Sequence, residues 1–140
     1  MVKILSFVIF KIIVLLNYFF KNLKYYLFEY LKKSSFTSIK FNNQDFKFFT
    51  PSGISEWRVK NFFVKEPETI EWIDNFNNNE DIIFWDIGAN IGVFSIYAAA
   101  KYKKIKIIAF EPSTLNLNIL TRNISINNLH DKMIINQFIN

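Results

Sequence analysis

Two acidic side chains, each directly after a short apolar run, are the residues of this chain best placed for chemistry. Asp86 follows the run Ile82–Trp85, and Glu111 follows the run Ile105–Phe110. Short apolar runs are typical of buried strands, and the carboxyl ends of parallel strands meet at one edge of a sheet. A carboxylate at the first position can attract a cationic group, and one at the second can accept hydrogen bonds from both hydroxyls of a ribose.

The loop after the first run supplies glycines. Gly88, Asn90 and Gly92 form a Gly-x-Asn-x-Gly turn, and an apolar, alanine-rich run from 93 to 100 follows. This pattern predicts a strand, a tight loop and a helix, with backbone N–H groups gathered at the start of the helix. Such a loop can hold the polar end of a nucleotide-like ligand. A purely structural turn with Asp86 as a capping acid is the alternative, and Glu111 at the expected distance favours the binding interpretation.

The charge of the site distinguishes between two classes of nucleotide cofactor. Nicotinamide and flavin enzymes normally show Gly-x-Gly-x-x-Gly, and this loop lacks the second and third glycines of that pattern. A pyrophosphate is anionic and would be repelled by Asp86, whereas S-adenosylmethionine carries an ammonium and a sulfonium that a carboxylate attracts. The sequence therefore favours S-adenosylmethionine as the cofactor.

Alternation of apolar runs with helical patterns predicts the fold class of residues 82–140. Strands that alternate with helices pair in parallel, so we expect an α/β, Rossmann-like, doubly wound sheet. The expected elements are strands at 82–86, 105–110 and 133–138 and helices at 91–101 and 113–127.

Residues 34–81 are expected to form a scaffold that packs on the nucleotide-binding half. A small β-hairpin is predicted within 36–49, with its turn at Asn42–Asn43. The segment Trp57–Val64 is expected to be a further strand. A helix is predicted over Lys65–Asp74, with Pro67 in its acidic first turn.

Residues 1–33 carry the whole net charge of +5, because they hold six lysines and one glutamate and the remainder is balanced. On a helical wheel of about 100° per residue the polar residues occupy about half of the circumference. A single basic, amphipathic helix at an anionic membrane surface is the favoured interpretation. A helix packed on protein stays open, as does a span or signal anchor, although Lys11 interrupts the apolar run and no small-residue cleavage site follows. This predicts a cytoplasmic location, peripheral at the inner face of the membrane.

The two motifs together resemble those of the FkbM-type methyltransferases over roughly residues 46–140. The residues that carry the resemblance are Asp86–Gly92, Ala109–Pro112, Asn118, Leu120 and Asn123, preceded by Lys65–Thr69. The resemblance implies a class I methyltransferase fold, S-adenosylmethionine as cofactor, and methylation of a hydroxyl oxygen on a sugar or similar metabolite. By position it assigns the methionine end of the cofactor to Asp86, Gly88, Asn90 and Gly92, the ribose to Glu111, and the adenine side to Phe110 and Pro112.

The chain resembles only the first half of that fold. The family's sheet has seven strands, and three are expected here, so the outer edge of the first strand would lie open to a partner. A truncated, non-catalytic remnant or binding module is therefore the alternative function. No catalytic base is identified, because His130 and Asp131 lie at the end of the sheet opposite the site. The expected partners are a small-molecule or glycan hydroxyl acceptor and a membrane surface, without nucleic acid, and no metal is expected because the chain lacks cysteine and has one histidine.

Overall fold

The computed structural model describes residues 1–41 and 43–137, which divide into two compact units. The first unit is Met1–Ser35, and the second begins at Phe36. The expected boundary between residues 81 and 82 separates no compact units, because residues before and after it share one hydrophobic core.

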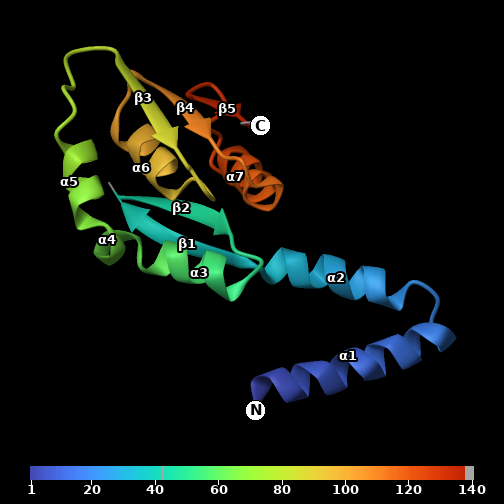
Figure 1. The fold of residues 1–140 in the computed structure, drawn as a ribbon. Coiled ribbons are helices and arrows are strands. Elements are labelled where there is room, and N and C mark those ends of the chain that lie inside the picture. Colours follow the sequence, from blue (N-terminus) through green and yellow to red (C-terminus); the bar gives the residue numbers. More distant parts are fainter. Residues whose placement is uncertain (42, 138–140) are drawn as a thin grey trace. The chain divides into compact units, whose positions relative to one another are not determined.

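The first unit contains two helices, α1 (Val2–Phe19) and α2 (Leu23–Ser34), joined by a short turn (Figure 1). The expectation of a single helix over residues 1–33 is wrong. Asn22 adopts a left-handed conformation with φ of 73°. A right-handed α-helix cannot continue through a residue in this conformation. The side-chain oxygen of Asn17 accepts a hydrogen bond from the backbone N–H of Lys24 at 3.2 Å, which ties the helices together at the turn.

The surface of α1 consists mostly of its own apolar side chains, and none of its residues is buried. Among the described helices, α1 is the one that is long and apolar enough to cross a membrane, a criterion that N-terminal signal sequences also meet. Its 18 residues span about 27 Å at 1.5 Å per residue, close to the hydrocarbon thickness of a bilayer.

The second unit opens with the predicted hairpin. Strands β1 (Phe36–Phe41) and β2 (Gln44–Phe49) pair antiparallel, with Phe41 opposite Gln44. At the turn, Asn43 has φ of 58°, a conformation that Asn tolerates well. Asn42, the other predicted turn residue, lies outside the described residues.

Three helices follow the hairpin: α3 (Gly53–Lys60), α4 (Phe62–Lys65) and α5 (Pro67–Asp74). The expected strand over Trp57–Val64 is wrong, because Ser52 and Ser55 form a reciprocal capping box that starts a helix four residues earlier. The helix after Lys65 is confirmed, and Pro67 occupies its first turn.

The remaining elements alternate as predicted: β3 (Ile82–Ile87), α6 (Val93–Lys101), β4 (Ile105–Phe110), α7 (Thr114–Ile126) and β5 (Met133–Asn136). The strands form a parallel sheet in the order β3-β4-β5, which confirms the α/β class. The predicted end of the last strand, Phe138, lies outside the described residues.

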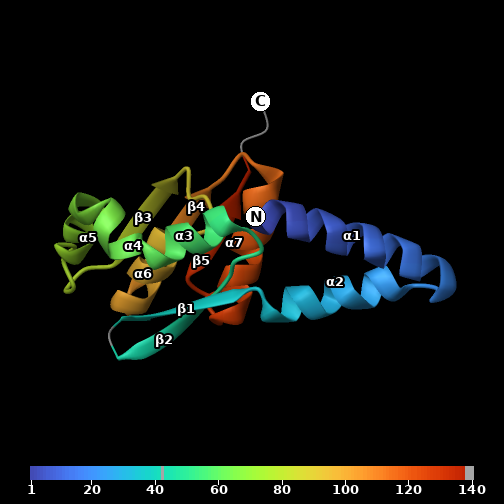
Figure 2. The same cartoon turned by 90° about the horizontal axis from the view of Figure 1, so that it is seen from below.

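The two crossovers place α6 and α7 on the same face of the sheet, since parallel connections are right-handed. The β1–β2 hairpin packs on the outer side of these helices, so the second unit has three layers (Figures 1 and 2). On the opposite face of the sheet, Ile83, Trp85 and Ile87 of β3 are exposed by 68, 59 and 70%. As expected, β3 is an edge strand of the described sheet.

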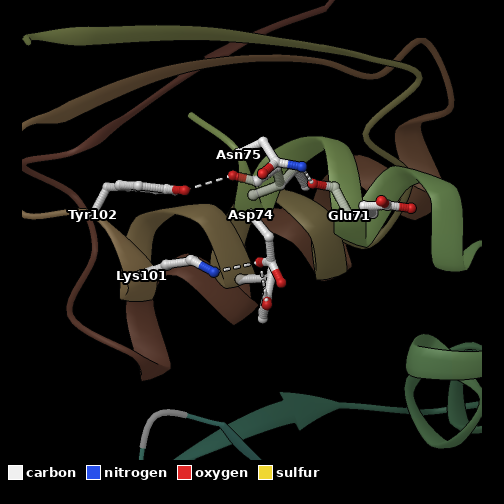
Figure 3. A network of polar contacts seen from close by, with 7 residues as sticks. Glu71, Asp74, Asn75, Lys101 and Tyr102 are labelled. Atoms are coloured by element: carbon white, nitrogen blue, oxygen red, sulfur yellow. Dashed lines mark hydrogen bonds and ion pairs between the residues drawn. The ribbon is translucent and has the colours of Figure 1, made fainter. Parts of the chain in front are cut away.

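A cluster of polar contacts fixes α5 against α6 (Figure 3). The Asp74 carboxylate accepts hydrogen bonds from the hydroxyl of Tyr97 and the ammonium of Lys101, both at 2.6 Å. The hydroxyl of Tyr102 donates to the carbonyl oxygen of Ile73, also at 2.6 Å. Burial and the neighbouring carboxylate raise the pKa of Tyr97, which keeps its hydroxyl available as a donor. These contacts position α5 beside the start of β3.

Candidate functional site

The loop between β3 and α6 is held tightly by the end of β4. The backbone N–H groups of Gly88 and Ala89 donate to the carbonyl oxygen of Phe110 at 2.8 and 2.9 Å, and the N–H of Gly92 donates to Ala89 at 2.8 Å. Three residues of the loop have left-handed backbones: Gly88 (φ 82°), Asn90 (φ 55°) and Gly92 (φ 84°). The N–H groups of Gly88, Ala89 and Gly92 are therefore engaged within the chain, and contact of a ligand with the rest of the loop and the start of α6 stays a prediction.

Glu111 is buried and completes the anchoring of the loop. One carboxylate oxygen accepts the N–H of Asn90 at 2.7 Å, and the other accepts the N–H of Ser113 at 2.9 Å and the side-chain amide of Asn116 at 3.2 Å. Ser113 also caps α7 through its side chain. In this arrangement Glu111 joins the loop to the start of α7, and its contact with a ribose stays a prediction.

A cavity of about 440 Å³ lies at the carboxyl end of β3. One wall comes from the loop and its flanking elements, and the other from α3, α4 and α5. The predicted residues that line it are Asp86, Gly88 and Asn90, whereas Gly92, Phe110, Glu111 and Pro112 do not. The volume is in the range of about 300–1,000 Å³ that small-molecule sites occupy.

Asp86 is the mostly buried acid of this cavity. Its carboxylate accepts a hydrogen bond from the hydroxyl of Ser95 on α6 at 2.5 Å. Burial raises the pKa of Asp86, Ser95 opposes that shift, and the nearby carboxylates of Glu111 and Glu66 add to it. A cationic group in the cavity would stabilise the ionised carboxylate, because Coulomb attraction is strong where water is scarce.

Asn90 presents an unsatisfied acceptor. Its side-chain oxygen is buried and receives no hydrogen bond from any described residue. Buried polar atoms nearly always have a partner, so an orphaned one needs an explanation. A ligand that carries an N–H or O–H group, bound in the cavity that Asn90 lines, would supply the missing donor.

Gly92 has a role in packing, which the sequence alone did not distinguish from a role in ligand binding. A Cβ atom at this position would lie 2.3 Å from Cδ1 of Leu120, which is fully buried in α7. A Cβ atom at Gly88, by contrast, would meet nothing within 4 Å. The two glycines therefore differ: Gly92 allows α7 to approach the loop, and Gly88 faces open space at the cavity.

The residues expected near the adenine follow β4. Phe110 is half-buried, with its ring centroid 5.7 Å from that of Trp85, and Pro112 is exposed. His130 and Asp131 are exposed and lie just before β5, at the end of the sheet opposite the cavity, as the sequence indicated.

Sequence reasoning missed the second wall of the cavity. Its residues come from α3, α4, α5 and the single residue that joins α4 to α5: Arg58, Phe62, Lys65, Glu66, Thr69 and Trp72. Steps of three or four separate most of these positions, which is the spacing of one face of a helix. That signal was present in the sequence, but the interpretation of residues 57–64 as a strand concealed it.

No family model matches the chain. It is 41% identical over 66 residues to the methyltransferase sdnD of Sordaria araneosa. The match covers 47% of this chain, and the chain spans only 26% of that relative.

Solved structures also resemble the chain. They include P. horikoshii TYW2 in complex with MeSAdo (22% identity, TM-score 0.45, covering 74% of this chain and 36% of that one). The tRNA (uracil-54, C5)-methyltransferase of Pyrococcus abyssi in complex with S-adenosyl-L-homocysteine has 17% identity and a TM-score of 0.46, covering 74% and 24%. Trm5 of Methanocaldococcus jannaschii in complex with adenosine has 24% identity and a TM-score of 0.43, covering 72% and 28%.

The two loop glycines make a matched test of this geometry. A Gly92→Ala variant is expected to lose about 3 kcal/mol of unfolding free energy, because backbone strain adds to the clash with Leu120. A Gly88→Ala variant has the strain alone and should lose about 1 kcal/mol. Urea denaturation followed by circular dichroism measures both. Equal losses would contradict the assignment of Gly92 to packing.

The raised pKa of Asp86 predicts an unusual pH dependence. The folded state binds this proton more tightly than the unfolded state, so ionisation of Asp86 destabilises the fold as pH rises through its folded pKa. An Asp86→Asn variant keeps an oxygen that can accept from Ser95. It should be more stable than the unchanged chain at neutral pH, and the gain should shrink at a pH near 4. Denaturation at both pH values measures the gain, with the exposed Asp81→Asn as control. A gain that grows on acidification would refute this account.

Proposed function

We propose that this chain is the cofactor-binding part of an S-adenosylmethionine-dependent methyltransferase. The observation that carries the proposal is the cavity at the carboxyl end of β3, with the mostly buried Asp86 in its wall. The similarity to a protein named as a methyltransferase supports it. The position at the end of parallel strands is where α/β sheets bind nucleotide-like ligands.

The lining of the cavity fits the amino-acid end of this cofactor. An ammonium group would pair with the Asp86 carboxylate and could also donate to the orphaned oxygen of Asn90. The sulfonium adds a second positive charge that favours the same carboxylate. Gly88 leaves room for the ligand to approach the backbone, since nothing lies within 4 Å of its missing side chain.

The bound cofactor would supply a methyl group for in-line displacement by an acceptor oxygen. This chain's contribution to that step is to orient the cofactor and to exclude water. An alcohol acceptor also needs a base for its proton, and the lining of the cavity provides no group that we assign to that task.

We propose further that the enzyme is of the FkbM type and that its acceptor is a hydroxyl group on a sugar or similar metabolite. The paired motifs Asp86–Gly92 and Ala109–Pro112 support the family. The charge of residues 36–140, with 11 basic and 11 acidic side chains, favours a small acceptor over a nucleic acid, since this part of the chain lacks the net positive charge that favours binding to a polyanion.

Binding without transfer is the second candidate function. The exposed apolar face of β3 favours it, because such a surface normally packs against further polypeptide. In this candidate the chain alone binds the cofactor without transferring its methyl group, and an acceptor site would form only with a partner that covers this face and the open β3 edge.

Calorimetric titration of the 140-residue chain tests cofactor binding. We expect S-adenosylmethionine to bind and an Asp86→Ala variant to bind at least about tenfold more weakly, since a charge-assisted hydrogen bond contributes about 1.5–3 kcal/mol. Circular dichroism of the variant controls for folding. Tight binding of NADH with no binding of S-adenosylmethionine would overturn the proposal. Methyl transfer by the chain alone would exclude the second candidate.

We also propose that residues 1–33 attach the protein to the cytoplasmic face of an anionic membrane. The exposed apolar surface of α1 supports this, as do the exposed lysines around α2. Aromatic residues accompany those lysines, and tyrosine is well suited to the boundary between water and lipid. The residues are Lys21, Lys24, Tyr25, Tyr26, Tyr30 and Lys33.

Vesicle flotation tests the membrane proposal. Replacement of Lys21, Lys24 and Lys33 by Gln should weaken binding to phosphatidylserine-containing vesicles by about tenfold or more, because each lysine near an anionic surface contributes about 1 kcal/mol. Replacement of the exposed Lys103 and Lys104 is the matched control and should change binding little. Binding that is equally strong to neutral vesicles and insensitive to salt would contradict the electrostatic contribution.

A further inference from the structure

We propose that Arg58 binds the α-carboxylate of the cofactor's methionine end, opposite the Asp86 carboxylate that binds its α-ammonium. The inference rests on the proposed function and adds a residue that no sequence motif indicated. It also sets the direction in which the amino-acid end lies across the cavity.

Arg58 is a cation of the cavity wall whose charge is not compensated within the chain. It lies in the last turn of α3 and is half-buried. Among the described residues its guanidinium finds no partner for an ion pair or hydrogen bond, whereas Lys65, the other cation of the lining, pairs with Glu66. A guanidinium presents paired N–H donors that match a carboxylate, so an anionic ligand group would complete this site.

The backbone that carries Arg58 is firmly positioned. The capping box of Ser52 and Ser55 fixes the start of α3. Just after α3, the ring of Phe62 packs on Phe94 and Tyr97 of α6, with centroid distances of 5.2 and 5.3 Å. The helix of Arg58 is therefore anchored to the helix that follows the glycine loop, and the guanidinium belongs to the same rigid wall as the cavity.

The charges of the lining match a zwitterion. With Lys65 and Glu66 paired, Arg58 and Asp86 remain as one positive and one negative group. An α-amino acid carries an ammonium and a carboxylate on one carbon and can satisfy both groups together. A pyrophosphate would satisfy Arg58 but be repelled by Asp86, and a simple cation would leave Arg58 unpaired. The methionine end of S-adenosylmethionine is the part of the proposed cofactor with this chemistry.

A pair of ligands that differ in the amino-acid end tests the assignment. S-adenosylhomocysteine keeps that end, and 5′-deoxy-5′-methylthioadenosine lacks it. In calorimetric titrations of the full chain, Arg58→Gln should weaken the binding of S-adenosylhomocysteine by about tenfold or more and leave the binding of methylthioadenosine unchanged. Arg58→Lys should lose less affinity for S-adenosylhomocysteine than Arg58→Gln, because lysine keeps the positive charge although it lacks the planar pair of donors.

Lys60→Gln is the matched control. Lys60 is on the same helix, pairs with Glu56 at 2.6 Å and does not line the cavity, so both ligands should bind as to the unchanged chain. Thermal melts followed by circular dichroism establish that each variant is folded.

The outcomes separate this inference from the proposed function. If the unchanged chain binds neither ligand, cofactor binding itself is wrong and the inference falls with it. If it binds S-adenosylhomocysteine and folded Arg58→Gln binds it equally well, the carboxylate contact is refuted while the proposed function stands. An equal loss of affinity for both ligands would also refute the carboxylate contact, because removing a contact with the amino-acid end cannot weaken the binding of a ligand that lacks that end.

Discussion

The rest of the second unit depends on two hydrogen bonds made by the fully buried side-chain amide of Asn123. Its oxygen accepts the backbone N–H of Phe49 in β2 at 2.7 Å, and its nitrogen donates to the carbonyl oxygen of Ile91 in the glycine loop at 2.8 Å. One side chain of α7 thereby joins the hairpin to the loop. Its removal would leave a buried donor and a buried acceptor unsatisfied, at a cost of about 1–3 kcal/mol each.

The loop is thus fixed from three directions before any ligand binds. Asn123 holds the carbonyl of Ile91, Glu111 holds the N–H of Asn90, and Leu120 fills the space next to Gly92. Because these contacts are made within the protein, a ligand has little backbone to order and loses little affinity to that cost. The groups left to contact a ligand in the cavity include two side chains, the carboxylate of Asp86 and the unpaired acceptor oxygen of Asn90. Such side-chain groups give selectivity among ligands.

Periodicity predicted the parallel half well, because strongly apolar runs separated by helical patterns leave few alternative folds. The segment 57–64 was misassigned because its aromatic and branched residues favour strands, while the deciding capping box lies just upstream at Ser52. The break at Asn22 has no comparable signal, since a helical wheel assumes a continuous helix. Sequence placed Asp86 and Glu111 near the site but not their partners, because Ser95 and Asn90 become neighbours only once α6 and the loop are folded.

The docking of the hairpin on α7 bears on how the chain is made. The side-chain amide of Asn127 exchanges hydrogen bonds with the backbone of Lys47, 80 residues earlier, and the guanidinium of Arg122 lies 3.8 Å from the ring centroid of Phe49. A ribosome adds about 5–20 residues per second, so β1 and β2 wait about 4–16 s for the helix that shields their phenylalanines. During that interval the nascent chain exposes an aromatic hairpin, which is the kind of surface that chaperones bind.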